Sequence, residues 1–326
     1  MNRIRIGFIG AGGIARLMAR TISEMPEVES YAVAARDLGR AEAFAREHGF
    51  LKSYGSYEEL VSDGGVELVY IATPHSHHFD HAMMCLNHGK PVLCEKAFTA
   101  NAPLARRLLD YAKEKQILVT EAIWTRYMPS VKMIHDLLDS GVIGAPTFLT
   151  ANLGYAVSHN QRITDPALAG GALLDVGLYP VNFASMVFGG EVEKVSAEAV
   201  MFDTGVDAMN NITMRFSGGR TAFLYSSVLS QTDREGVIYG DKGSLIVDNV
   251  NNPERIHVIS LGYKETACYD VPKQITGYEY QVRSVIKALS ENRIECPEMP
   301  HSETIRIMEI LDGIRASWGM RYPFEV

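Results

Sequence analysis

Cysteine and tryptophan are scarce in this sequence. The chain has four cysteines and two tryptophans among 326 residues. The cysteines, Cys85, Cys94, Cys268 and Cys296, form no CxxC pair, and four are too few to hold a chain of this length together through disulfides. We therefore expect reduced thiols. Because the first residues run directly into a strand-like pattern without a signal peptide, we also expect a cytoplasmic protein.

Long apolar runs and an excess of positive charge are also missing. Apolar stretches break within about ten residues, well short of the roughly 20 that a membrane-spanning helix needs. The 31 lysines and arginines are outnumbered by 39 aspartates and glutamates, for a formal net charge of -8, and they form no long basic block. Proteins that bind a nucleic-acid backbone carry such blocks. We therefore expect neither a membrane nor a nucleic acid as a partner.

What is present is an alternation of strand-like and helix-like segments over residues 1–123. Short apolar runs predict strands at residues 3–9, 31–35, 66–72, 91–94 and 117–120. Helices are expected between them, with Ser56 and Glu59 as a capping box, Ser76 and Asn101 as N-caps, and Gly49 as a stop. Strands that alternate with helices predict a parallel sheet in a doubly wound α/β domain of the Rossmann type.

Residues 124–326 follow a different pattern and are predicted to form a second domain. Helices are expected near residues 130–140, 173–188, 278–291 and 302–318, and closely spaced strands fill residues 192–260. Such strands favour antiparallel pairing, so we expect an α+β domain with a large, open, mainly antiparallel sheet. Because the second face of an open sheet needs a cover, we expect a homo-oligomer that forms through this sheet.

A glycine-rich loop after the first strand matches a dinucleotide-binding motif. Gly10, Gly12 and Ala15 fit the GxGxxA form, and Gly13 and Ile14 open the following helix. The first glycine permits a tight turn, the second lets the backbone approach a pyrophosphate, and the alanine lets helix and strand pack closely. The helix N-terminus adds free N–H groups for the phosphates. The alternative is a glycine-rich turn in an α/β domain that binds no nucleotide.

The end of the second strand indicates which nicotinamide cofactor is bound. A carboxylate at this place holds the ribose diol of NAD, whereas an arginine holds the 2'-phosphate of NADP. The predicted strand ends at Arg36, and Arg40 lies four residues further on, so we expect NADP. If the strand ends one residue later, Asp37 takes the diol-binding place and NAD becomes the cofactor.

Reactive side chains follow three of the predicted strands. Ligands bind beyond the carboxyl ends of the strands in open parallel sheets, so these positions mark the expected reaction centre. They are Thr73, Pro74 and His75 after one strand, Glu95 and Lys96 after the next, and residues 121–126 after the third. A lysine at such a place is expected to point toward the nicotinamide rather than into bulk solvent.

Two sets of motifs carry a resemblance to a known family. The first set is the glycine loop, Thr73 and Pro74 followed by His78, and residues 94–96; the second is residues 34–38, 121–126, 171–179, 188–190 and 299–303. Together they resemble the Gfo/Idh/MocA oxidoreductase family, and the second set resembles its dimeric dihydrodiol dehydrogenase branch, whose members also oxidise D-xylose with NADP. Ala97 departs from the family pattern, in which a proline usually follows the lysine, and His75 replaces a common asparagine.

The resemblance implies that Lys96 and Asp175 lie at the substrate and that the second domain binds substrate and forms dimers or tetramers. The histidine usually found four residues after the aspartate is Tyr179 here, and this spacing places both side chains on one helix face. We expect Tyr179 to remove the proton of a substrate hydroxyl, helped by a nearby ammonium that stabilises its phenolate, while Lys96 holds the oxygen and Asp175 orients the sugar or the lysine. Expected cofactor contacts are Thr73, Pro74, His75, His78, Glu95, Lys96, Trp124 and Arg126, and expected substrate contacts are Lys96, Trp124, Arg162, Asp175 and Tyr179.

The predicted function is that of an NADP-dependent dehydrogenase of a sugar, a cyclic polyol or a trans-dihydrodiol. An NAD-dependent inositol or sugar dehydrogenase and a dinucleotide-binding regulator without turnover are the alternatives. His159, Arg162 and Asp165 could equally contact substrate or form a solvated loop. His77 and His81 are spaced for a metal, but no cysteine or glutamate beside them completes a ligand set, so we expect no metal.

Overall fold

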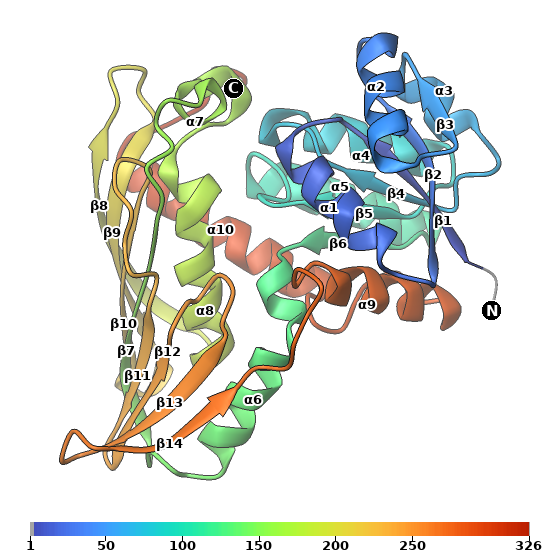
Figure 1. The fold of residues 1–326 in the computed structure, drawn as a ribbon. Helices are drawn as coiled ribbons and strands as arrows, with labels where there is room; N and C mark the ends of the chain where they lie inside the picture. The colour runs from blue at the N-terminus through green and yellow to red at the C-terminus, as the bar shows by residue number, and fades with distance from the viewer. Residues whose placement is uncertain (1–2, 326) are drawn as a thin grey trace. The chain divides into compact units, whose positions relative to one another are not determined.

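The computed structural model describes residues 3–325 and divides into two compact units (Figure 1). The first comprises Met1–Tyr127 and Gln274–Met308, and the second comprises Met128–Lys273 and Glu309–Val326. The boundary predicted at 123/124 lies four residues before the first of these segments ends. Residues 274–308 were predicted as part of the second domain, but they pack with the first unit. Periodicity along the chain does not reveal this packing.

The first unit is built on a six-stranded parallel sheet. Its strands are β1 (Ile4–Ile9), β2 (Val28–Ala34), β3 (Lys52–Tyr54), β4 (Leu68–Ile71), β5 (Val92–Glu95) and β6 (Val119–Ala122). They are ordered β3-β2-β1-β4-β5-β6, the order of a doubly wound dinucleotide-binding fold. Every residue of β4, β5 and β6 is buried, as expected for strands covered on both faces. The predicted Rossmann-type sheet is confirmed.

Helices flank this sheet where the local sequence can begin and end them. They are α1 (Gly13–Ser23), α2 (Leu38–His48), α3 (Tyr57–Ser62), α4 (His78–Asn87), α5 (Ala102–Lys115), α9 (Glu279–Ser290) and the start of α10 (His301–Ser317). The capping box of Ser56 and Glu59 and the Asn101 cap are confirmed, and Gly49 ends α2 in the left-handed conformation. The predicted cap at Ser76 is wrong, because a 3₁₀ turn precedes α4 and the Ser76 hydroxyl makes no hydrogen bond.

The second unit is built on an eight-stranded sheet. Its strands are β7 (Pro146–Gly154), β8 (Val192–Met201), β9 (Asp207–Phe216), β10 (Thr221–Ser227), β11 (Gly236–Gly240), β12 (Gly243–Val247), β13 (Arg255–Ser260) and β14 (Glu265–Asp270). The order is β14-β13-β12-β11-β7-β10-β9-β8, and among the described strands of this sheet only β7 and β10 pair in parallel. The mainly antiparallel sheet is confirmed.

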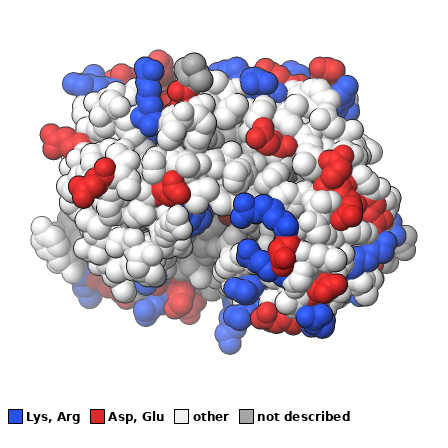
Figure 2. Space-filling model, turned by 90° about the horizontal axis from the view of Figure 1, so that it is seen from above, with Lys and Arg blue, Asp and Glu red and all other residues white. Residues whose placement is uncertain are grey.

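Helices α6 (Pro129–Asp139), α7 (Gln161–Thr164) and α8 (Leu178–Phe188) complete the second unit, and α8 packs on β7 and β10 (Figure 1). One helical stretch among residues 3–325, Pro166–Phe188, has the length and apolar composition of a membrane span, and 89% of its most apolar window is buried. Its apolar character is explained by its place in the core of the unit. On the face seen in Figure 2, basic and acidic side chains are interspersed, with broad uncharged areas between them.

Candidate functional site

The glycine loop lies between β1 and α1 and leaves space at its tip. Gly10 has a φ of 103°, and a Cβ on it would lie 2.8 Å from the Ala72 carbonyl oxygen, so a side chain is excluded. A Cβ on Gly12 or Gly13 would meet nothing within 4 Å, and Ala15 is fully buried. On one side the loop therefore lies close to the backbone of Ala72, and on the other it leaves an open cradle at the N-terminus of α1. This arrangement fits a dinucleotide pyrophosphate.

Arg36 and Arg40 are exposed beyond the end of β2. The strand ends at Ala34, and Asp37 is the N-cap of α2, where its Oδ1 accepts a hydrogen bond from the Arg40 backbone N–H at 2.9 Å. The Asp37 carboxylate is therefore already used within the protein. The positive charges of both arginines act on the Tyr57 phenol, whose pKa is nevertheless raised because the ring is half-buried. Both guanidinium groups thus lie near the Tyr57 side chain, beyond the end of β2.

The backbone that carries Lys96 is supported by buried polar side chains. Glu95 accepts a 2.6 Å hydrogen bond from the Tyr70 hydroxyl, and Phe98 N–H donates to Glu121 Oε1 at 3.2 Å. The peptide bond between Lys96 and Ala97 is cis. Lys96 itself is half-buried, whereas the residues on either side of it are buried. The lysine is thus the accessible side chain between two buried residues at the end of β5.

His78 links this segment to the loop after β4. Its Nδ1 lies 2.8 Å from the Ala97 carbonyl oxygen and its Nε2 lies 2.8 Å from the Thr73 carbonyl oxygen. Burial lowers the pKa of His78 to about 4, so at neutral pH the ring is neutral and donates from one nitrogen at a time. Both ring nitrogens face carbonyl oxygens of the protein, so His78 can affect a cofactor by holding in position the two loops that it joins.

Trp124 and Arg126 are both engaged within the first unit. The indole stacks on the Tyr278 ring with centroids 4.2 Å apart, and a Cβ on Gly277 would lie 2.6 Å from its ring. Arg126 forms an ion pair with Glu303, which also holds Arg306 at 2.8 Å. Thr73 and Pro74 are half-buried, and His75 is buried with its ring centroid 5.7 Å from that of His78.

In the second unit, Asp175 and Tyr179 lie where two types of helix meet. Leu173–Gly177 is a π-helical turn and α8 begins at Leu178, so the prediction of one regular helix is wrong in its first turn. Both side chains are nearly buried, at 8% and 6% exposed. Arg162 Nη1 lies 2.9 Å from Asp175 Oδ1, so a residue of the short helix α7, 13 positions earlier in the chain, holds the carboxylate. Sequence reasoning had left open whether Arg162 is a solvated loop residue.

Asp207 on β9 holds the start of the π-helical turn. Its Oδ2 accepts hydrogen bonds from the Leu173 N–H at 2.8 Å and from Asn210 Nδ2 at 2.9 Å. Gly171 has a φ of 112°, and a Cβ there would lie 2.4 Å from Asp207 Oδ1. Burial raises the pKa of Asp207 to about 6. Sequence reasoning missed this residue, because a lone aspartate in a stretch of predicted strands carries no signal for a partner 34 residues away.

Comparisons with known proteins agree with this architecture. A family model described as "Oxidoreductase family, NAD-binding Rossmann fold" matches residues 4–123, and one described as "GFO/IDH/MocA C-terminal domain" matches residues 131–246. The trans-1,2-dihydrobenzene-1,2-diol dehydrogenases of Bos taurus and Homo sapiens are each 35% identical to this chain, over 330 and 328 residues. Each alignment covers 98% of this chain and 98% of the relative.

A solved structure shares both units of the fold. The crystal structure of KijD10, a 3-ketoreductase from Actinomadura kijaniata in complex with NADP and TDP-benzene, superposes with a TM-score of 0.89. The two proteins are 26% identical, and the alignment covers 97% of this chain and 98% of that one.

Proposed function

The chain belongs to the Gfo/Idh/MocA family of oxidoreductases, whose N-terminal domain binds NAD or NADP, and on this premise we propose that it is an NADP(H)-dependent dehydrogenase of a sugar or trans-dihydrodiol. The observation that carries the proposal is the open cradle at Gly12 and Gly13, next to the excluded side chain at Gly10. Backbone N–H groups at the start of α1 are available there for a pyrophosphate.

The choice of NADP rests on the end of β2. Arg36 and Arg40 present exposed guanidinium groups, while the Asp37 carboxylate caps α2. Arginine suits the 2'-phosphate because its planar fork matches phosphate oxygens. The Actinomadura ketoreductase is likewise described in complex with NADP. Thr73, Pro74, His75, His78, Glu95, Lys96, Trp124 and Arg126 are proposed to form or support the rest of the cofactor site.

We assign the proton chemistry to Tyr179, Lys96 and Asp175. When bound, the nicotinamide supplies the hydride acceptor for oxidation of an alcohol carbon. Tyr179 acts as a phenolate stabilised by the Lys96 ammonium: it takes the proton of the substrate hydroxyl, and the resulting phenol returns the proton in the reverse direction. The Lys96 ammonium holds the same hydroxyl oxygen and favours its deprotonation. Asp175, fixed by Arg162, accepts hydrogen bonds from neighbouring hydroxyls and so orients the substrate.

The substrate class follows from the relatives and from the residues of the second unit. The curated relatives are named for a cyclic trans-diol, and the Actinomadura protein is a 3-ketoreductase. Asp175 and Arg162 offer an acceptor and donors that suit adjacent hydroxyls. A small-molecule alcohol is therefore the substrate, and we propose a free aldose such as D-xylose or a trans-dihydrodiol over an inositol.

An absorbance screen for NADPH formation tests the proposal. Purified protein with NADP+ or NAD+ should be offered free aldoses, inositols and trans-dihydrodiols. Turnover of an aldose or a dihydrodiol with a preference for NADP+ is the expected result. Turnover of inositol with NAD+ alone would support the NAD-dependent alternative, and NADP binding without any turnover would support a regulator.

We also propose a homo-oligomer, a dimer or a tetramer, that forms through the sheet of the second unit. One face of this sheet is covered by α8, while Phe148, Phe223 and Tyr225 are more than a third exposed. Phe148 stacks on Tyr239 with centroids 4.3 Å apart and lies 6.2 Å from Phe223, which makes a continuous aromatic surface. A surface of this kind is a protein contact more often than a solvated face.

A cytoplasmic location is proposed because all four cysteines are free thiols.

A further inference from the structure

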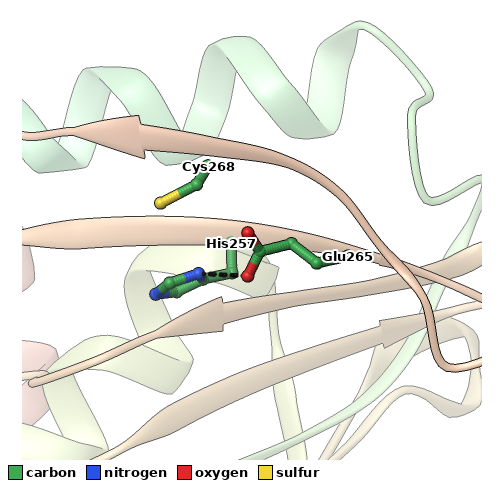
Figure 3. A group of neighbouring side chains, drawn as sticks. All are labelled: His257, Glu265 and Cys268. Atoms are coloured by element: carbon green, nitrogen blue, oxygen red, sulfur yellow. Dashed lines mark hydrogen bonds and ion pairs between the residues drawn. The ribbon is translucent and has the colours of Figure 1, made fainter.

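A histidine, a glutamate and a cysteine converge on the last two strands of the second unit (Figure 3). His257 on β13 and Cys268 on β14 are directly opposite each other in the antiparallel register. Glu265 begins β14, and its Oε2 lies 2.8 Å from His257 Nδ1. One potential ligand atom from each of the three residues lies within 4.8 Å of the other two.

The cluster lies on the outer side of the sheet. Ile256 and Val258 are buried, so His257 between them points to the opposite face. Cys268 is the exposed member of the four cysteines, whereas the other three are buried. Glu265 and Cys268 are exposed and the His257 side chain is 19% exposed, so a ligand can reach the three side chains from solvent.

These three ligand types together select a particular metal. Thiolate, imidazole and carboxylate are the donors that Zn²⁺ takes, at about 2.3 Å for sulfur and about 2.0 to 2.2 Å for nitrogen and oxygen. A tetrahedral ion with such bond lengths brings its ligand atoms to within about 4 Å of each other, so modest side-chain rotations would close the site. Calcium and magnesium prefer all-oxygen ligands and do not suit a thiolate.

The charges around the cluster also favour a cation. Glu235 interacts electrostatically with His257 and Asp248, while Arg255 is drawn to Asp248 at 4.0 Å. The carboxylates of Glu235 and Glu265 thus both act on the imidazole, while Asp248 acts on Glu235 and is paired with the Arg255 guanidinium. A divalent ion would relieve the mutual repulsion of these carboxylates.

We propose that His257, Glu265 and Cys268 form a zinc site, with water as the fourth ligand. On binding, the Cys268 thiol releases its proton to solvent, and a lone pair of a neutral His257 nitrogen and one Glu265 oxygen complete the protein ligands. The ion joins β13 to the edge strand β14 through side chains, in addition to the backbone ladder. Zinc would therefore stabilise the outer hairpin of the sheet. The site is separate from the residues proposed for catalysis, so neither proposal depends on the other.

Zinc binding to the chelator-treated full-length protein tests the proposal directly. Competition with a zinc-binding dye should show one zinc per chain, and Co²⁺ should give a thiolate-to-metal charge-transfer band. Cys268→Ser and His257→Gln should each weaken zinc binding by more than about 100-fold, because loss of a residue that only supports a metal ligand weakens binding by about 10 to 100-fold. Cys268→Ser should also abolish the charge-transfer band. His88→Gln is the matched control, because His88 also pairs with a glutamate, at 3.0 Å from Glu58.

Amide hydrogen exchange gives a second, local readout. Zinc should slow the exchange of residues 255–270 in the unsubstituted protein and leave it unchanged in Cys268→Ser. No zinc binding, binding that persists in both ligand variants, or binding that His88→Gln reduces equally would overturn the proposal. A loss confined to one of the two ligand variants would also contradict a site built from all three residues.

Discussion

Arg162 and Asp175 form an ion pair, Nη1 to Oδ1 at 2.9 Å, in which the carboxylate side chain is 10% exposed and the guanidinium side chain 36%. The pair joins the short helix α7 to the π-helical turn that leads into α8. A nearly buried carboxylate is costly without a partner, so the arginine fixes the charge and the direction of Asp175. We therefore propose Arg162, on α7, as part of the candidate substrate site.

The first prediction concerns this pair. Arg162→Ala should lower kcat/KM by about tenfold or more, equivalent to about 1.4 kcal/mol, because Asp175 loses the group that orients it. Asp175→Asn should have an effect at least as large, and the double variant should lose less than the sum of the two. Arg162→Lys, which keeps the charge, should recover part of the activity. Strictly additive effects in steady-state kinetics would show that the residues act independently.

A second prediction concerns the cofactor. Arg36→Ala should weaken NADP+ binding by about tenfold or more, since a charge-assisted hydrogen bond contributes about 1.5 to 3 kcal/mol. NAD+ has no 2'-phosphate, so its affinity should not change. Arg46→Ala, at the exposed end of α2, is the control and should alter neither affinity. Titration calorimetry measures both, and tighter NAD+ than NADP+ binding, unchanged in Arg36→Ala, would contradict the assignment.

A third prediction concerns stability and pH. Burial raises the pKa of Glu121 from 4.5 to about 7, so the folded protein keeps this proton when the unfolded chain has already released it. Protonated Glu121 contributes its full share to the free energy of unfolding below pH 4.5, and this share is lost as the pH rises to 7. The free energy of unfolding falls by about 1.4 kcal/mol per pH unit at most. Glu121→Gln should remove this component. Urea unfolding at several pH values measures it, and an unchanged slope in the variant would exclude Glu121 as the cause.

A fourth prediction concerns assembly. Phe223→Glu places a charge in the aromatic surface beside Phe148 and should shift the protein toward monomers, as measured by light scattering after size-exclusion chromatography. Leu51→Glu is the matched control, because Leu51 is also exposed but lies in the first unit. An assembly that survives Phe223→Glu, or a wild-type monomer, would place the oligomer interface elsewhere or remove it.

Local signals in the sequence predicted much of the fold. The capping box at Ser56 and the cap at Asn101 were predicted correctly, because these hydrogen bonds join residues three apart. The three-residue strand β3 was missed, since three residues are too few to show a period. Strand β14 was missed as well, and its mostly exposed residues explain why, because an edge strand carries little apolar alternation.

The candidate site was predictable in its residue types but less so in its contacts. The loop motifs identified Gly10, Gly12 and Lys96 because each follows a buried strand. The ion pair of Arg126 with Glu303 could not be predicted, since the two residues are 177 positions apart and nothing local links them. The π-helical turn at Asp175 was read as ordinary helix because its apolar periodicity resembles that of an α-helix.

The central claim is that Tyr179 moves the substrate proton in an NADP-dependent oxidation. The most direct test compares NADP+ reduction by the unsubstituted protein, Tyr179→Phe and the control Tyr111→Phe, whose phenol hydrogen-bonds to Asn87 on the surface of the first unit. We predict that kcat falls by about 100-fold or more in Tyr179→Phe alone, with NADP+ affinity unchanged. Near-normal turnover of Tyr179→Phe, with the protein folded and NADP+ bound, would contradict the account.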